Sequence, residues 1–313
     1  MRDKSIFRKF TLPLTAAALV ALASSILASP SASGQRTFAT PQQAGRALLA
    51  AAESNDMSGL SAIFGPESDE ILNSGDPVDD ENHRAAFVKK AKQSLKWQIV
   101  PANTNRAHLL IGTDNFAFPI PLVKTAGRWH FDTPSGKTEI LARRIGANEL
   151  DAIAACKAYV DAQYDYASED RNKNGIPEYA RKLISSPGER DGLFWPGADA
   201  PPTQFASRVE TAESEGYRKD DDAPTPYHGY YFRMLLGQGP NARGGALDYI
   251  HDGSMIGGFG LVAWPAEHGV SGIQTFLVNQ DGVIYEKDLG AKTSAAVEAI
   301  TTFDPDKTWR RVR

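Results

Sequence analysis

The chain has few cysteines and few histidines. Cys156 is the only cysteine among 313 residues, so the chain can form no internal disulfide bond. Helical periodicity places Cys156 on one face with Leu150, Ile153, Val160 and Tyr164, and no histidine stands near it in the sequence. We therefore expect a buried structural thiol and not a catalytic nucleophile.

The common catalytic motifs are missing as well. The six histidines form no H-E-x-x-H pair, and the chain has neither a G-x-S-x-G elbow nor an S-x-x-K motif. The glycine-rich stretches "GQGPNARGG" and "IGGFG" flank predicted antiparallel strands, whereas a dinucleotide site needs a strand followed directly by a helix. These absences disfavour zinc hydrolases, serine hydrolases and nucleotide-binding enzymes, and we predict no catalytic residue.

The chain also lacks an excess of positive charge. The formal net charge is −4, and residues 1–34 contain four basic side chains against one acidic one, so the remainder carries −7. Phosphate binding needs clustered lysine and arginine. We expect no nucleic-acid partner.

The first 34 residues have the pattern of a secretory signal peptide. Basic residues precede the apolar run "FTLPLTAAALVALASSILA", and small residues follow it. We expect cleavage between Ala28 and Gln35, a periplasmic or secreted product, and no membrane span after removal. An uncleaved membrane anchor is the alternative.

The order of predicted elements after this leader favours an α+β fold of two domains, each with helices and an antiparallel sheet. The first domain, residues 38–146, has two helices followed by strand-like runs. The second, residues 147–313, has one long helix, a polar loop at 197–226 and four strand-like runs. We expect the helix between the domains to break at Gly146, with Asn148 capping its second piece.

Aromatic residues gather in the strand-like runs of the first domain. Trp97, Phe116, Phe118, Trp129 and Phe131 would line a cavity if the sheet curves into a cone. The alternative is an ordinary hydrophobic core under a curved sheet.

Long segments resemble a known family. "AYVDAQYDYASED", "HGYYFRMLLGQGP" and "FDPDKTW", with "SGDPVDD" and "EILARRIGANEL" before them, resemble the bacterial secreted family called domain of unknown function 2950. The resemblance covers nearly all of the chain after the leader. It implies secretion but no activity, because none is assigned to the family.

Two weaker resemblances concern the fold. Residues 148–289 resemble the globular head of type II secretion pseudopilins, with a long helix, an irregular loop and an antiparallel sheet. The helix here is amphipathic and internal, so the resemblance implies the head's fold and not filament assembly. By element order, the first domain resembles cone-like domains of the nuclear transport factor and SnoaL type, or a cystatin-like domain.

The stretch "DRNKNGIPEYA" begins like a calcium loop, with alternating oxygen ligands and Gly175 at the sharp turn. Arg181 stands where such a loop usually has a bidentate glutamate, so we expect a weak Ca²⁺ site. Without metal, the same residues are typical of a helix stop. The candidate ligands are Asp170, Asn172, Asn174, the carbonyl of Ile176, and Glu178.

A second candidate site lies at the edge of the second sheet. Tyr227, His228 and Tyr231 begin one predicted strand and Trp264 ends the next, which antiparallel pairing brings together. Such a corner can bind a small polar ligand. The alternative is a packed corner with a hydrogen-bonded histidine.

The sequence thus favours a non-catalytic binding or assembly module of the cell envelope, which calcium would stabilise if the Asp170 loop binds it. Its partner would be an envelope protein or a small ligand. Two alternatives remain open: a hydrolase with a site near His228, and small-ligand binding in a first-domain cone lined by Trp97 and Trp129.

Overall fold

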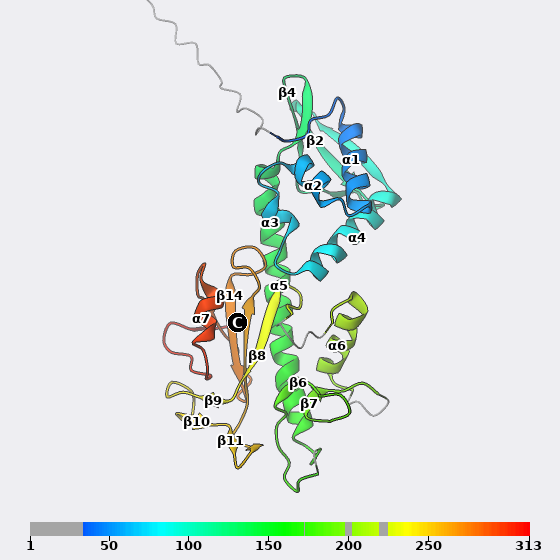
Figure 1. Ribbon diagram of the computed structural model, residues 1–313. Helices are drawn as coiled ribbons and strands as arrows, with labels where there is room; N and C mark the ends of the chain where they lie inside the picture. The colour runs from blue at the N-terminus through cyan, green and yellow to red at the C-terminus, as the bar shows by residue number, and fades with distance from the viewer. Residues whose placement is uncertain (1–33, 172, 198–201, 219–224) are drawn as a thin grey trace, which may run out of the picture. The chain divides into compact units, whose positions relative to one another are not determined.

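The computed structural model describes residues 34–171, 173–197, 202–218 and 225–313. The predicted signal peptide lies outside these residues, except for its last position. The described residues form helices and mainly antiparallel sheets, which confirms the α+β class (Figure 1). Within them, no helix combines the length and the apolar character that crossing a membrane requires.

The described elements have the following bounds. The helices are α1 (Pro41–Glu53), α2 (Met57–Phe64), α3 (Asp69–Leu72), α4 (Pro77–Gln93), α5 (Thr133–Tyr166), α6 (Gln204–Glu215) and α7 (Thr293–Glu298). The strands are β1 (Leu95–Val100), β2 (Asn103–Ile111), β3 (Phe116–Ala117), β4 (Leu122–Thr125), β5 (Arg128–Phe131), β6 (Lys182–Ile184), β7 (Gly192–Phe194), β8 (Tyr230–Leu235), β9 (Gly237–Gln238), β10 (Leu247–Asp248), β11 (Ile250–His251), β12 (Ser254–Met255), β13 (Gly260–Pro265), β14 (Gln274–Asn279), β15 (Tyr285–Asp288) and β16 (Arg310–Arg311).

The first sheet has the order β1-β2-β4-β5, with β3 paired to β2. Helices α1 and α2 supply Leu48 and Ile63 to the core that covers it, where they meet Leu109 of β2 and Phe131 of β5. Helix α1 begins at Pro41, where the Thr40 hydroxyl caps it by accepting a hydrogen bond from the Gln43 amide.

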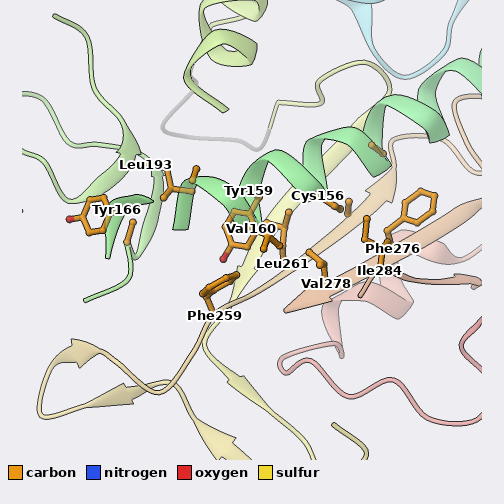
Figure 2. Close-up of a cluster of buried hydrophobic side chains, with 14 of the residues drawn as sticks. Cys156, Tyr159, Val160, Tyr166, Leu193, Phe259, Leu261, Phe276, Val278 and Ile284 are labelled. Carbon is orange, nitrogen blue, oxygen red and sulfur yellow. The ribbon is translucent and has the colours of Figure 1, made fainter. Parts of the chain in front are cut away.

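The second sheet has the order β16-β15-β14-β13-β8, and all its strand pairs are antiparallel. The two-residue period of a strand divides its side chains between two cores. Leu261 and Phe276 face helix α5 in one core, where Tyr159 and Cys156 also lie (Figure 2). Val262 lies in the opposite core, with Val297 of α7 among its members.

Helix α5 corrects one prediction, because it runs without a break through Gly146. A glycine inside a helix costs about 1 kcal/mol relative to alanine, which the packing of a helix of 34 residues readily offsets. Asn148 caps nothing: its side-chain amide is buried and donates to the carbonyl of Ser271 at 3.0 Å.

The buried thiol is confirmed, but its helical face was predicted incorrectly in part. Cys156 is buried, and burial raises the pKa of its thiol to about 12. Its buried neighbours on α5 are Ala152 and Tyr159, whereas Leu150 is 70% exposed.

The predicted long loop at 197–226 is a second correction, since it contains helix α6. Thr203 caps the start by accepting from the Ala206 amide, and Gly216 ends the helix with a φ of 103°. The polar composition concealed this helix because α6 is largely exposed and buries chiefly Ala206.

Candidate functional site

A cavity of about 830 Å³ lies between α4, α5 and the edge of the first sheet. Residues from several elements build its apolar wall, notably Leu60, Phe64, Phe87, Phe116, Phe118 and Ile140. Its polar residues are Asp79, Asp80, His83, Arg84 and Lys90 of α4, Arg143, Arg144, Asn148 and Asp151 of α5, and His228. A mostly apolar cavity of this size with a few placed polar groups is typical of a small-ligand site.

Helix periodicity explains why these side chains converge. Residues three or four positions apart in a helix share one face. On α4 the lining residues 79, 83, 87 and 90 follow this spacing, and residues 80 and 84 lie beside them. Along α5, residues 140, 143, 144, 147, 148 and 151 do the same. Each helix therefore presents a mixed apolar and charged stripe to the cavity.

The first polar group of the cavity is the pair Asp79 and His83. The Nδ1 atom of His83 lies 3.2 Å from Oδ2 of Asp79, one turn earlier in α4. Asp79 is buried and its carboxylate raises the pKa of His83, whereas the His83 side chain is 64% exposed.

The second polar group joins Asp80 and Arg144. Oδ2 of Asp80 accepts from the amide of Ser74 at 2.9 Å. Burial raises the pKa of Asp80, while the hydrogen bonds of Ser74 and the charge of Arg144 oppose that rise. Arg144 donates to the carbonyls of Glu70 and Ile71 at 2.8 Å each, so it also holds α3.

His228 forms the third polar group and lies between two carboxylates. Its Nδ1 atom is 3.2 Å from Oδ2 of Asp151, and its Nε2 atom is 2.8 Å from Oε2 of Glu215 in α6. Burial lowers the pKa of His228, but the two carboxylates outweigh it and raise the pKa to about 9. The imidazole is therefore a cation at neutral pH, hydrogen-bonded to Glu215 through Nε2 and in ion-pair contact with Asp151 at Nδ1.

A buried carboxylate fixes the turn that holds His228. Asp76, 1% exposed, accepts at Oδ2 from the Tyr217 hydroxyl and from the Gly229 amide, each at 2.9 Å. Its Oδ1 atom accepts from the Asp79 amide at 3.2 Å and so caps α4. His228 and Gly229 have φ of 46° and 74°, as a tight turn with two left-handed residues requires.

The predicted aromatic corner is only partly assembled. Tyr227 stacks on His228 with ring centroids 4.1 Å apart. Tyr231 and Trp264 pack together at 5.5 Å, but Trp264 faces the core under α7, because side chains alternate along the strands. The four residues therefore do not form one site.

The two interpretations of the first-domain aromatic residues, a cavity lining and an ordinary core, each hold for some of them. Phe116 and Phe118 line the cavity, whereas Trp97, Trp129 and Phe131 are not among its lining residues. Trp129 and Phe131 are buried in the first core, and Trp97 packs against that core.

The Asp170 loop holds its shape through hydrogen bonds of its own. Asp170 accepts from the amides of Asn174 at 3.1 Å and Gly175 at 2.8 Å. Glu178 is buried, and its Oε2 atom accepts from the Met255 amide at 3.0 Å, which ties the loop to β12. Asn172 lies outside the described residues. Among those described, no three histidine, cysteine or acidic side chains gather where they could hold a metal ion, and Ca²⁺ at this loop stays a prediction.

Sequence reasoning missed most of the cavity's polar residues. Of the three polar groups, it singled out only His228. The segment "SGDPVDD" supported a family resemblance, although it holds the α4 cap and two cavity carboxylates. Two acidic residues directly after an Asp-Pro helix start were the available signal.

Comparison with known proteins gives one match. No curated protein and no solved structure matches the chain, so the resemblances to pseudopilin heads and cone-like domains stay predictions. One family model, described as "Protein of unknown function (DUF2950)", matches residues 35–312, nearly the whole chain after the predicted leader. The chain therefore belongs to the DUF2950 family.

Proposed function

We propose that the chain is a non-catalytic binding module of the bacterial cell envelope, periplasmic or secreted, that takes a small molecule into the cavity between α4 and α5. The cavity of about 830 Å³, with four phenylalanines in its wall and charged side chains along α4 and α5, is the observation that carries the proposal. The predicted signal peptide supports the location. The proposed partner is accordingly a small ligand and not an envelope protein.

A hydrolase is the second candidate, and the geometry of His228 argues against it. A general base needs a free ring nitrogen and a pKa near the working pH, whereas His228 is paired at both nitrogens and has a pKa of about 9. His83 is the better base, since Asp79 orients it and it lines the cavity. Hydrolysis of a p-nitrophenyl ester that His83→Gln abolishes would favour this candidate.

The binding proposal predicts the effect of filling the cavity. Ala147 lines the cavity from an exposed position on α5, so Ala147→Trp adds an indole to the space without disturbing the core. We expect the uncharged probe N-phenyl-1-naphthylamine to bind the unaltered protein saturably, and Ala147→Trp to weaken it about tenfold or more. Fluorescence titration gives both dissociation constants.

The matched control is Ala154→Trp, two turns further along α5. Ala154 is exposed and lies outside the cavity lining, so the same side chain on the same helix should leave probe affinity unchanged. Equal affinities of all three proteins would contradict the proposal, because the probe would then bind elsewhere.

Stabilisation by calcium is a separate part of the proposal. A site with a dissociation constant of about 10⁻⁴ M would raise the melting temperature by about 2–3 °C at millimolar Ca²⁺ relative to EDTA. We expect Asp170→Ala to lose this response, because Asp170 is the first predicted ligand. Asp161→Ala removes an exposed carboxylate from α5 and should keep it. An Asp170→Ala protein that responds as the unaltered one does would show that the loop is only a helix stop.

A further inference from the structure

The charge of the cavity lining differs in sign from that of the whole chain. The chain has a formal net charge of −4. The lining contains Arg84, Lys90, Arg143 and Arg144 against three aspartates, and the His228 cation adds to the excess. An acidic chain thus concentrates positive charge around an apolar cavity, which favours an anionic ligand.

The aspartates of the lining are already engaged. Asp79 is paired with His83. Oδ1 of Asp151 accepts a hydrogen bond from Arg208 at 2.8 Å, and Oδ2 of Asp151 lies 3.2 Å from Nδ1 of His228. Asp80 accepts from Ser74. Asp151 is therefore flanked by two cations, whereas Asp80 has a neutral hydrogen-bond partner, so the preference for an anion rests on the exposed cations at the cavity edge.

Two of the cations gather around one aromatic ring at the edge of the cavity. Phe116 is 38% exposed, with Lys90 Nζ 5.0 Å and Arg143 Cζ 5.5 Å from its ring centroid. Their acidic partners Asp114 and Glu139 are more than half exposed. Ion pairs this exposed to solvent are weak, so an arriving anion can replace these carboxylates.

The apolar wall continues inward from this ring. Phe118 lies 5.6 Å from Phe87 and 6.3 Å from Phe64 between ring centroids, and all three line the cavity. A molecule that fits both features has an apolar chain among the phenylalanines and an anionic group beside Lys90 and Arg143.

We infer that the ligand of this cavity is a single-chain amphiphile with an anionic head group, a carboxylate or a phosphate, bound between Lys90 and Arg143. The inference rests on the proposed function and adds the chemical class of the ligand. Lysine offers a point charge to such a head group and arginine a planar pair of donors, and both suit carboxylate and phosphate.

Calorimetric titration with amphiphiles of one chain length separates the head group from the chain. The probes are decanoate, decyl phosphate, decanol and decyltrimethylammonium. We expect decanoate or decyl phosphate to bind about tenfold or more tightly than the other two, and added salt to weaken only the anionic probes. Preference for either anion supports the inference and shows which head group the site takes.

Variants at the head-group site move the affinity in opposite directions. Lys90→Gln with Arg143→Gln should weaken decanoate about tenfold and leave decanol unchanged. Glu139→Gln should strengthen decanoate, because it frees Arg143 from its exposed partner, a gain that a merely structural role would not give. Lys89→Gln removes an exposed charge beside Lys90 from outside the lining and serves as the control.

Failure of this inference differs from failure of the proposed function. If decyltrimethylammonium or decanol binds as tightly as the anions, and Ala147→Trp still blocks them, the cavity is a ligand site of another class and the inference is overturned. If no probe depends on Ala147, the proposed function falls with it.

Discussion

Asp76→Ala is expected to lower the free energy of unfolding by about 3–7 kcal/mol, a very large effect for a single substitution. The Asp76 carboxylate is buried and accepts from the Tyr217 hydroxyl, the Gly229 amide and the Asp79 amide. Alanine removes the α4 cap, worth about 1 kcal/mol, and leaves two buried donors without a partner at about 1–3 kcal/mol each. Urea unfolding gives the change directly.

Asp56→Ala is the matched control for this variant. Asp56 caps α2 by accepting from the Gly59 amide at 2.8 Å, but it is exposed and this hydrogen bond is local to the start of its own helix. Its loss should cost about 1 kcal/mol. If Asp76→Ala costs no more than Asp56→Ala, the contacts to Tyr217 and Gly229 do not stabilise the fold.

The second large effect is a loss of stability in alkaline solution. The pKa of His228 is about 9 in the folded chain and about 6.5 in the unfolded chain. The two carboxylates beside the His228 cation therefore stabilise the folded chain. This stabilisation is fully present below about pH 6.5 and is lost as the pH rises through 9. Each unit of pKa difference between the folded and the unfolded chain corresponds to about 1.36 kcal/mol, so the free energy of unfolding should fall by about 3 kcal/mol.

Urea unfolding at several pH values between 6 and 10 measures this effect, with His228→Asn as the control. Asparagine does not titrate and tolerates the left-handed φ of 46° at this position. Subtracting its curve removes the contribution of other groups, including Tyr227 and Tyr217, whose rings contact the imidazole. Parallel curves for the two proteins would mean that Asp151 and Glu215 do not stabilise the His228 cation.

The sequence predicted the elements well where periodicity and caps agree. The sequence predicts helices at α1 and α4, each with a capping side chain, and most strands of both sheets. Two predictions were wrong for the same reason: they used the local sequence alone, whereas tertiary packing decides whether a helix forms there. Gly146 does not break α5, and the polar composition of α6 conceals a capped helix.

The candidate site was much less predictable. His228 was singled out for its aromatic neighbours, but its carboxylate partners come from α5 and α6, 77 and 13 residues away in the chain. Asp76 reaches Gly229 across 153 residues. No local pattern encodes such contacts, because they depend on how α4, α5 and the turn before β8 meet.

The lining of the cavity was also only partly predictable from the sequence. Two interpretations of the first-domain aromatic residues were left open, a cavity lining and an ordinary core; Phe116 and Phe118 line the cavity, whereas Trp129 is buried in the core. The side of a strand that a residue faces follows from alternation, yet which side is covered by helices depends on the fold. In the sequence, the charged residues of α4 and α5 have the pattern of solvent-exposed helix faces. The structure shows that the two helices flank one cavity and that these residues line it.

Hydrogen exchange with and without saturating N-phenyl-1-naphthylamine tests the central claim most directly, because it locates the bound molecule. A ligand that binds only the folded state slows exchange in the segments it contacts. We expect slowing in peptides from α4, from residues 116–120 and from the 140–151 part of α5, which wall the cavity. Slowing confined to β13 and β14, or none at saturation, would contradict the claim that this cavity is the binding site.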